Sequence, residues 1–150
     1  MIESVLNNEK DMTAVGIDLA SALQPGCYIT LKGDLGSGKT CLCRGILRGL
    51  GFLGRVKSPT YPILETYKLE TGTVFHFDFY RISNPKEIFD AGFEEFFGHS
   101  DICLVEWPER TEGALRVPDI SIEIDFHGDG RLVKINALTK LGKHCLEEIS

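Results

Sequence analysis

A glycine-rich segment at residues 33–40 carries the clearest chemical signal of the sequence, because its pattern is typical of loops that bind phosphate. It reads Gly-Asp-Leu-Gly-Ser-Gly-Lys-Thr and matches G-x-x-x-x-G-K-[ST]. In such loops the glycines let backbone N–H groups point inward, the lysine (here Lys39) reaches the outer phosphates, and the hydroxyl (here Thr40) can bind a metal ion. The segment therefore predicts a nucleoside triphosphate and Mg²⁺ as ligands.

The flanks of this segment have the pattern that a phosphate-binding loop requires. Residues 27–31 form a short β-prone run after the break at Pro25-Gly26. After the loop, apolar residues recur at helical spacing between residues 42 and 50, where glycines interrupt them. We therefore expect a strand, the loop and a helix in that order.

Two acids at the ends of predicted strands are candidates for the catalytic residues. A triphosphate with Mg²⁺ needs a carboxylate opposite the loop, because Mg²⁺ prefers hard oxygen ligands and an attacking water must be oriented. Glu106 closes the apolar run 102–105, and Asp78 lies near the end of the run 74–80. The ligands of α/β folds gather at such strand ends. We expect both acids in the site, and these patterns leave open which of them binds the metal.

Two further polar residues lie near these acids in the sequence. Alternation with a period of two puts His76 and Asp78 on one face of their strand and three phenylalanines on the other. We interpret His76 as a packed strand histidine rather than a catalytic one. Thr60, which follows the break at Ser58-Pro59, could sense the last phosphate as switch residues do.

The remaining periodicities predict an α/β fold with one mixed sheet, parallel near the loop and antiparallel towards its edges. The further elements that we expect are a helix over 12–23, a hairpin of 61–69 and 74–80, a helix from the Asn84-Pro85 capping pattern to about Gly98, a strand over 102–105, and a hairpin of 120–126 and 132–137.

Length, charge and cysteine usage narrow the function classes. We expect residues 1–150 to form a single domain, since this length buries enough surface for one core. A formal net charge of −6 argues against a large nucleic-acid surface, so we expect any RNA contact through a partner. The five cysteines lack metal-binding spacing and are expected to be reduced thiols. The sequence has no signal-peptide pattern and no long apolar run, so we expect a cytoplasmic protein without a membrane partner.

Other classes of nucleotide-binding protein fit the sequence less well. A small G protein should carry D-x-x-G after its switch strand, but Asp78 is followed by Phe79-Tyr80-Arg81, and residues 139–142 lack the acid of a guanine motif. A small-molecule kinase usually carries an arginine-rich lid, and no comparable segment separates the strands here. A small-molecule kinase is thus less favoured, and we keep it as the second interpretation.

Four segments have the order and spacing of one known family. They are the 33–40 loop, Val56-Lys57-Ser58-Pro59-Thr60-Tyr61, His76-Phe77-Asp78-Phe79-Tyr80-Arg81 and Cys103-Leu104-Val105-Glu106-Trp107-Pro108. With them the sequence resembles the TsaE family, also called YjeE, the bacterial ATPases of tRNA threonylcarbamoyladenosine synthesis. The resemblance covers residues 10 to 137 or so, and its last three strings are more specific than the loop.

The resemblance implies a P-loop NTPase-like three-layer fold and an ATPase that uses ATP and Mg²⁺ and joins two partner proteins, TsaD and TsaB. Of these, TsaD transfers the threonylcarbamoyl group to an adenosine beside the tRNA anticodon, so this chain would contact tRNA only indirectly. A different class stays open, a nucleotide-dependent binding module in which ATP shapes a docking surface and hydrolysis is incidental.

Carried over by position, the resemblance also implies roles for single residues. Thr40 and Glu106 would hold Mg²⁺, Asp78 would contact the nucleotide or the attacking water, and Trp107 would lie close to both. The phosphates would be held by Gly36, Ser37, Gly38, Lys39, Thr40 and Cys41.

The sequence departs from the family pattern at two positions. Cys41 stands where a second threonine is common, and Phe79 replaces the usual leucine, but neither change removes a charged group. The surface that binds the base is less defined by the motifs, and Asn8 and Arg131 are candidates for it.

Overall fold

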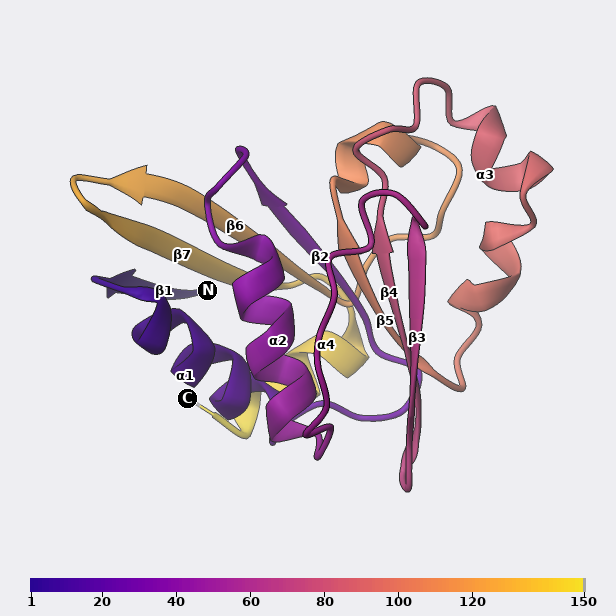
Figure 1. The fold of residues 1–150 in the computed structure, drawn as a ribbon. Coiled ribbons are helices and arrows are strands. Elements are labelled where there is room, and N and C mark those ends of the chain that lie inside the picture. The colour runs from indigo at the N-terminus through magenta and orange to yellow at the C-terminus, as the bar shows by residue number, and fades with distance from the viewer. Residues whose placement is uncertain (150) are drawn as a thin grey trace.

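The computed structural model describes residues 1–149 and contains one seven-stranded mixed sheet with helices on both faces (Figure 1). The strand order is β1-β7-β6-β2-β5-β4-β3. The strands are β1 (Ile2–Leu6), β2 (Tyr28–Gly33), β3 (Leu64–Leu69), β4 (Gly72–Asp78), β5 (Ile102–Glu106), β6 (Ile120–His127) and β7 (Gly130–Ala137). The helices are α1 (Glu9–Ala20), α2 (Lys39–Gly49), α3 (Lys86–Asp90) and α4 (Lys140–Glu147), with 3₁₀ turns η1 (Phe93–Phe97) and η2 (Pro108–Thr111).

The centre of the sheet is parallel and its edges are antiparallel, which confirms the predicted mixed sheet. Strand β2 pairs in parallel with β5 and β6, and β5 pairs in parallel with β4. The pairings of β1 with β7, β7 with β6 and β3 with β4 are antiparallel. Parallel strands need cover on both faces, and β5 accordingly has all five residues buried.

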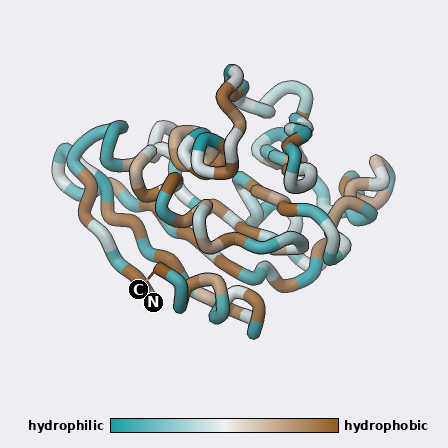
Figure 2. The backbone as a smooth tube through the Cα atoms, turned by 90° about the horizontal axis from the view of Figure 1, so that it is seen from below, coloured by the Kyte–Doolittle hydropathy of each residue, from teal (hydrophilic) through white to brown (hydrophobic). Residues whose placement is uncertain are grey.

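The two faces of the sheet are covered by two apolar clusters. Helices α1 and α2 pack on one face, and α3 with η1 packs on the other (Figure 1). Apolar positions follow the strands through the middle of the molecule, and polar positions gather in the outer turns (Figure 2). Helices α1 and α2 approach closely, because a Cβ on Gly16 would lie 2.6 Å from the Leu42 carbonyl oxygen. This contact fixes the middle of α2 against α1.

The predicted helix between Asn84 and Gly98 is wrong in its length. The expected capping contacts form, because Asn84 Oδ1 accepts from Lys86 N and Glu87 Oε2 accepts from Asn84 N, both at 2.9 Å. The helix nevertheless ends at Asp90, and Gly92 adopts a left-handed φ of +73° before η1 begins. The break lets the η1 rings pack against Phe77 of β4, which helical periodicity alone does not reveal.

Two elements were absent from the prediction, and several bounds differ. Neither the edge strand β1 nor helix α4 was expected. Helix α1 begins at Glu9 and ends at Ala20, because Asn8 Oδ1 caps it by accepting from Asp11 N at 2.8 Å. Strand β3 begins only at Leu64, after Ile63 with φ +70°. No helix within residues 1–149 is long and apolar enough to cross a membrane.

Candidate functional site

The 33–40 loop connects β2 to α2, so the predicted order of strand, loop and helix is confirmed. Gly36 and Gly38 have φ values of +76° and +111°, a region in which side chains with a Cβ are strained. A Cβ on Gly33 would lie 2.5 Å from Ser37 Oγ. These three glycines are therefore required by the curl of the loop.

Lys39 is the first residue of α2 and is only 5% exposed. Its Nζ donates to the carbonyl oxygens of Gly33 at 2.5 Å and Asp34 at 3.0 Å, and it lies 4.4 Å from the ring centre of Trp107. Burial lowers the pKa of Lys39, while the charges of Glu106 and Asp78 partly offset that shift. The ammonium group thus has neutral backbone partners at close range, and a phosphate would be a stronger partner than a carbonyl.

Thr40 and Glu106 are in direct contact. The Thr40 hydroxyl lies 3.1 Å from Glu106 Oε1 and 3.0 Å from Oε2, and Glu106 is only 2% exposed. The parallel register places Glu106 of β5 beside Leu31 of β2 and Asp78 of β4. Both predicted acids therefore lie at the carboxyl ends of the central strands, at the end of the sheet where α2 begins.

Asp78 contacts the segment between α2 and β3. Its Oδ2 accepts from Thr60 Oγ1 at 3.0 Å, and its Oδ1 accepts from Tyr80 N at 2.8 Å. Burial raises the pKa of Asp78 above its usual value, and the Tyr80 and Thr60 hydrogen bonds partly offset this shift. The Arg81 Nε donates to the Thr60 carbonyl at 2.9 Å and holds the segment there. Thr60 is thus brought to the site, as its position after Ser58-Pro59 suggested.

His76 is fully buried in β4, as the packed interpretation predicted, but it is not surrounded by apolar groups alone. Its Nε2 lies 2.7 Å from Glu106 Oε2. The sequence analysis missed this contact. Alternation places His76 and Asp78 on one face of β4, which was a partial signal, but the pairing of β4 with β5 is seen only in the structure. Glu106 is therefore held by Thr40 on α2 and by His76 on β4.

These side chains line one cleft in front of the loop, which extends over Lys39, Thr40, Thr60, Asp78, Glu106 and Trp107. Trp107 is half-buried, with a left-handed φ of +58° directly after β5. Its ring centre lies 4.9 Å from that of Tyr80. Trp107, with Tyr80 packed against it, therefore forms one wall of the cleft.

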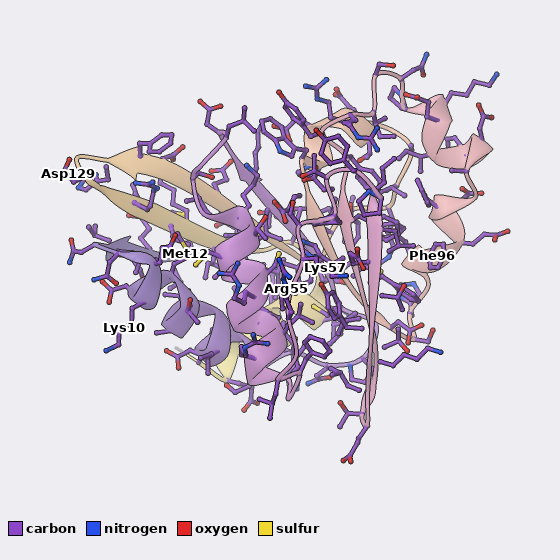
Figure 3. The ribbon with its side chains drawn as sticks, in the orientation of Figure 1. Lys10, Met12, Arg55, Lys57, Phe96 and Asp129 are labelled. Carbon is purple, nitrogen blue, oxygen red and sulfur yellow. The ribbon has the colours of Figure 1, made fainter. Side chains whose placement is uncertain are left out.

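A second hollow lies on the other side of the loop, between the start of α1 and the β6–β7 turn. Its lining includes Asn8, Met12, Gly38, Cys41, Asp129 and Arg131. Figure 3 labels Met12 on α1 and Asp129 at the tip of the hairpin. Arg131 donates to the carbonyl oxygens of Ser37 at 3.1 Å and Gly36 at 3.2 Å. Asn8 and Arg131, the two predicted base-binding candidates, thus border the same hollow.

Comparison with known proteins identifies the family. The family model described as threonylcarbamoyl adenosine biosynthesis protein TsaE matches residues 6–133. The chain belongs to the TsaE family. A tRNA threonylcarbamoyladenosine biosynthesis protein TsaE of Haemophilus influenzae is 43% identical over 122 residues, which cover 81% of this chain and 77% of that protein. The TsaE protein of Bacillus subtilis is 34% identical over 95% of this chain and 90% of its own length.

The fold is shared with a solved TsaE-like structure. The crystal structure of Bacillus subtilis YdiB superposes with a TM-score of 0.83 at 28% identity and covers 99% of this chain and 93% of that chain. The resemblance seen in the four sequence segments and the predicted α/β fold are therefore both confirmed.

Proposed function

We propose that this chain is a Mg²⁺-dependent ATPase that supports threonylcarbamoyl transfer to a tRNA adenosine beside the anticodon, in complex with TsaD and TsaB. Its TsaE relatives are named for the biosynthesis of this modified nucleoside. The observation that carries the ATPase part is the convergence of Lys39, Thr40, Asp78 and Glu106 at one cleft in front of a glycine loop. These groups have the charges that a magnesium–nucleotide complex needs.

The donor set fits Mg²⁺ and a phosphate chain. A buried carboxylate and a hydroxyl lie about 3 Å apart at Glu106 and Thr40, and both are hard oxygen ligands. Ser37 Oγ is buried and has no hydrogen-bond partner within residues 1–149. Mg²⁺ bound by Thr40 and Glu106 would neutralise phosphate charge, and Lys39 would exchange its carbonyl contacts for the outer phosphates. The remaining phosphate ligands would come from the backbone and side chains of residues 36–41.

Asp78 has the environment of a residue that orients water. Its carboxylate accepts from Thr60 and from the Tyr80 backbone, so its direction is fixed before any ligand arrives. Burial raises its pKa, which brings the carboxylate closer to the range in which it can accept a proton from an attacking water. Thr60 would sense the last phosphate through the same hydrogen bond.

The nucleoside would occupy the hollow beside Asn8 and Arg131. The guanidinium of Arg131 lies 4.5 Å from the ring centre of Phe126 and is tied to the loop carbonyls, so it is held in place beside residues 36 and 37. A planar cation stacked on an aromatic ring offers a flat surface for a base.

Partner proteins would bind around the cleft, because apolar side chains surround it. Leu35 is 60% exposed, Tyr61 is 81% exposed, and Trp107 is half-buried. The same feature favours the second candidate, a binding module in which ATP shapes the docking surface. With a net charge of −6, this chain would reach tRNA only through its partners. We expect this work to take place in the cytoplasm.

Steady-state hydrolysis of Mg–ATP separates these functions. The chain is assayed alone and then with TsaD and TsaB, and phosphate release is measured. We expect weak turnover alone and strong stimulation by the partners. Tight complex formation with unchanged turnover would favour the binding module, and loss of ATP without phosphate release would favour a kinase. Absence of ATP binding under all these conditions would refute the proposal.

A further inference from the structure

Glu106 also belongs to a group of three side chains that could hold a metal ion. A His76 ring nitrogen, the Cys43 thiol sulfur and a Glu106 carboxylate oxygen all lie within 4.8 Å of one another. Cys43 and His76 are fully buried and Glu106 is 2% exposed. The three residues come from α2, β4 and β5, so only the folded chain brings them together.

The imidazole of His76 has an unused ligand atom. Its Nε2 lies 2.7 Å from a Glu106 carboxylate oxygen, and in the neutral ring that donates to this oxygen Nδ1 keeps its lone pair. This Nδ1 is buried and has no hydrogen-bond partner in the described part of the chain. An unpaired buried acceptor is costly, and a bound cation would satisfy one of the ring nitrogens.

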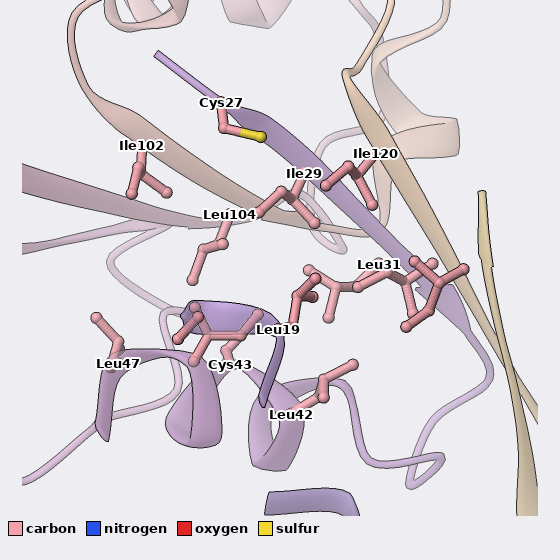
Figure 4. Packing of buried hydrophobic residues seen from close by; sticks show 14 of the residues in the cluster. Leu19, Cys27, Ile29, Leu31, Leu42, Cys43, Leu47, Ile102, Leu104 and Ile120 are labelled. Atoms are coloured by element: carbon pink, nitrogen blue, oxygen red, sulfur yellow. The ribbon is translucent and has the colours of Figure 1, made fainter. Parts of the chain in front are cut away.

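Cys43 supplies a buried sulfur atom beside the other two ligand atoms. Figure 4 shows Cys43 on α2 among the apolar side chains that pack against the sheet, such as Leu47 and Leu104. When a divalent cation forms a bond with Sγ, the thiol proton leaves to solvent. The thiolate and the Glu106 carboxylate then balance both positive charges of the ion.

We propose that Cys43, His76 and Glu106 form a site for a thiophilic divalent cation such as Zn²⁺, which competes with Mg²⁺ for Glu106. One sulfur, one nitrogen and one oxygen ligand with a fourth position for water is a donor set that Zn²⁺ accepts, whereas Mg²⁺ takes oxygen ligands only. The three ligand atoms lie within 4.8 Å of one another. Bonds from Zn²⁺ to these atoms are about 2.0 to 2.3 Å long, so the atoms that are farthest apart must approach each other by about 1 Å. Because Nε2 and not Nδ1 faces Glu106, the ring must turn for Nδ1 to reach an ion that Glu106 also binds. The His76–Glu106 hydrogen bond opens in this step, so Glu106 cannot keep its orientation towards Thr40.

Co²⁺ is a spectroscopic substitute for Zn²⁺ and tests the site directly. Nucleotide-free, reduced protein is titrated with Co²⁺, and absorption is recorded. We expect a thiolate-to-Co²⁺ charge-transfer band with visible bands of tetrahedral Co²⁺, at one ion per chain, and loss of both on adding Zn²⁺. Cys43→Ser should abolish the charge-transfer band. The matched control Cys103→Ser, which changes a buried cysteine outside the cluster, should retain it.

Two outcomes would overturn the proposal. One is the absence of a charge-transfer band in the parent protein, which depends on no variant. The other is a band of equal strength in folded Cys43→Ser protein. Glu106→Gln should weaken Co²⁺ binding by about tenfold or more, because it removes a charged ligand.

Competition with Mg²⁺ is the only part that rests on the proposed function. Mg–ATP should weaken Co²⁺ binding to the parent protein, because both ions need Glu106. A Co²⁺ band that requires Cys43 and Glu106 but ignores Mg–ATP would support the thiophilic site and count against Glu106 as the Mg²⁺ ligand. The two proposals can therefore fail separately.

Discussion

Replacing Glu106 by glutamine should weaken the binding of Mg²⁺ without weakening the binding of free ATP. Glu106 is 2% exposed and accepts from Thr40 at 3.0 to 3.1 Å and from His76 at 2.7 Å. Glutamine has the same shape, so packing is retained, but it carries no charge. The expected effect is therefore on the ion and not on the loop.

The magnitude follows from the loss of one charged interaction in a buried site. Interactions with a charged partner are worth about 1.5 to 3 kcal/mol, which corresponds to a roughly 10- to 150-fold change in an equilibrium constant. We expect the apparent affinity for Mg²⁺ at saturating ATP to fall by this factor. Affinity for ATP without Mg²⁺ should stay the same or increase, because a negative charge has been removed beside the phosphates.

Calorimetric ATP titrations at a series of Mg²⁺ concentrations measure both quantities. Glu112→Gln is the matched control, because it removes one negative charge at an exposed position after η2 and should leave both affinities unchanged. The melting temperature shows that the variants are folded. A folded Glu106→Gln protein with parental Mg²⁺ affinity would refute the role of Glu106 as a metal ligand.

The further predictions concern three other cleft residues, Lys39, Asp78 and Trp107. Lys39→Ala should weaken ATP binding at least about tenfold, because it removes charged contacts with the phosphates, and unchanged affinity in calorimetry would contradict the loop assignment. Asp78→Asn should suppress partner-stimulated hydrolysis more than ATP binding, which parallel turnover and binding assays would check. Burial raises the folded-state pKa of Asp78 above its usual value, so the parent protein loses the stability linked to protonated Asp78 as pH rises. Asparagine does not titrate. The melting temperature of Asp78→Asn relative to that of the parent should therefore increase from about pH 4 to pH 7. Trp107 fluorescence should change when nucleotide binds, because Lys39 Nζ lies 4.4 Å from its ring. Trp107→Ala should reduce partner-stimulated turnover, and it should lower the free energy of unfolding by less than the about 3 to 5 kcal/mol lost with a fully buried aromatic side chain. A large fall in melting temperature with full stimulation would indicate a packing role instead.

Much of the site could be predicted because its signals are local. The 33–40 loop needs particular residue types in consecutive positions, and its flanking strand and helix show their own periodicity. Asp78 and Glu106 could be identified as strand-end acids, since the ends of apolar runs can be read from the sequence. The edge strand β1 and the helix α4 were missed. The Thr139 hydroxyl, which caps α4 by accepting from Gly142 N at 3.1 Å, was a signal that was not used.

The sequence by itself determined the local chemistry of this protein, namely a glycine loop that ends in Lys39 and Thr40 and two acids that lie at the ends of strands. Only the tertiary structure decided which of these groups touch. The parallel register of β4 and β5 sets Glu106 beside Asp78 and near His76, and the packing of α2 on the sheet brings Thr40 and Cys43 to Glu106. The physical reason is that strand register and helix packing depend on pairings between residues far apart in the chain, which no local periodicity encodes.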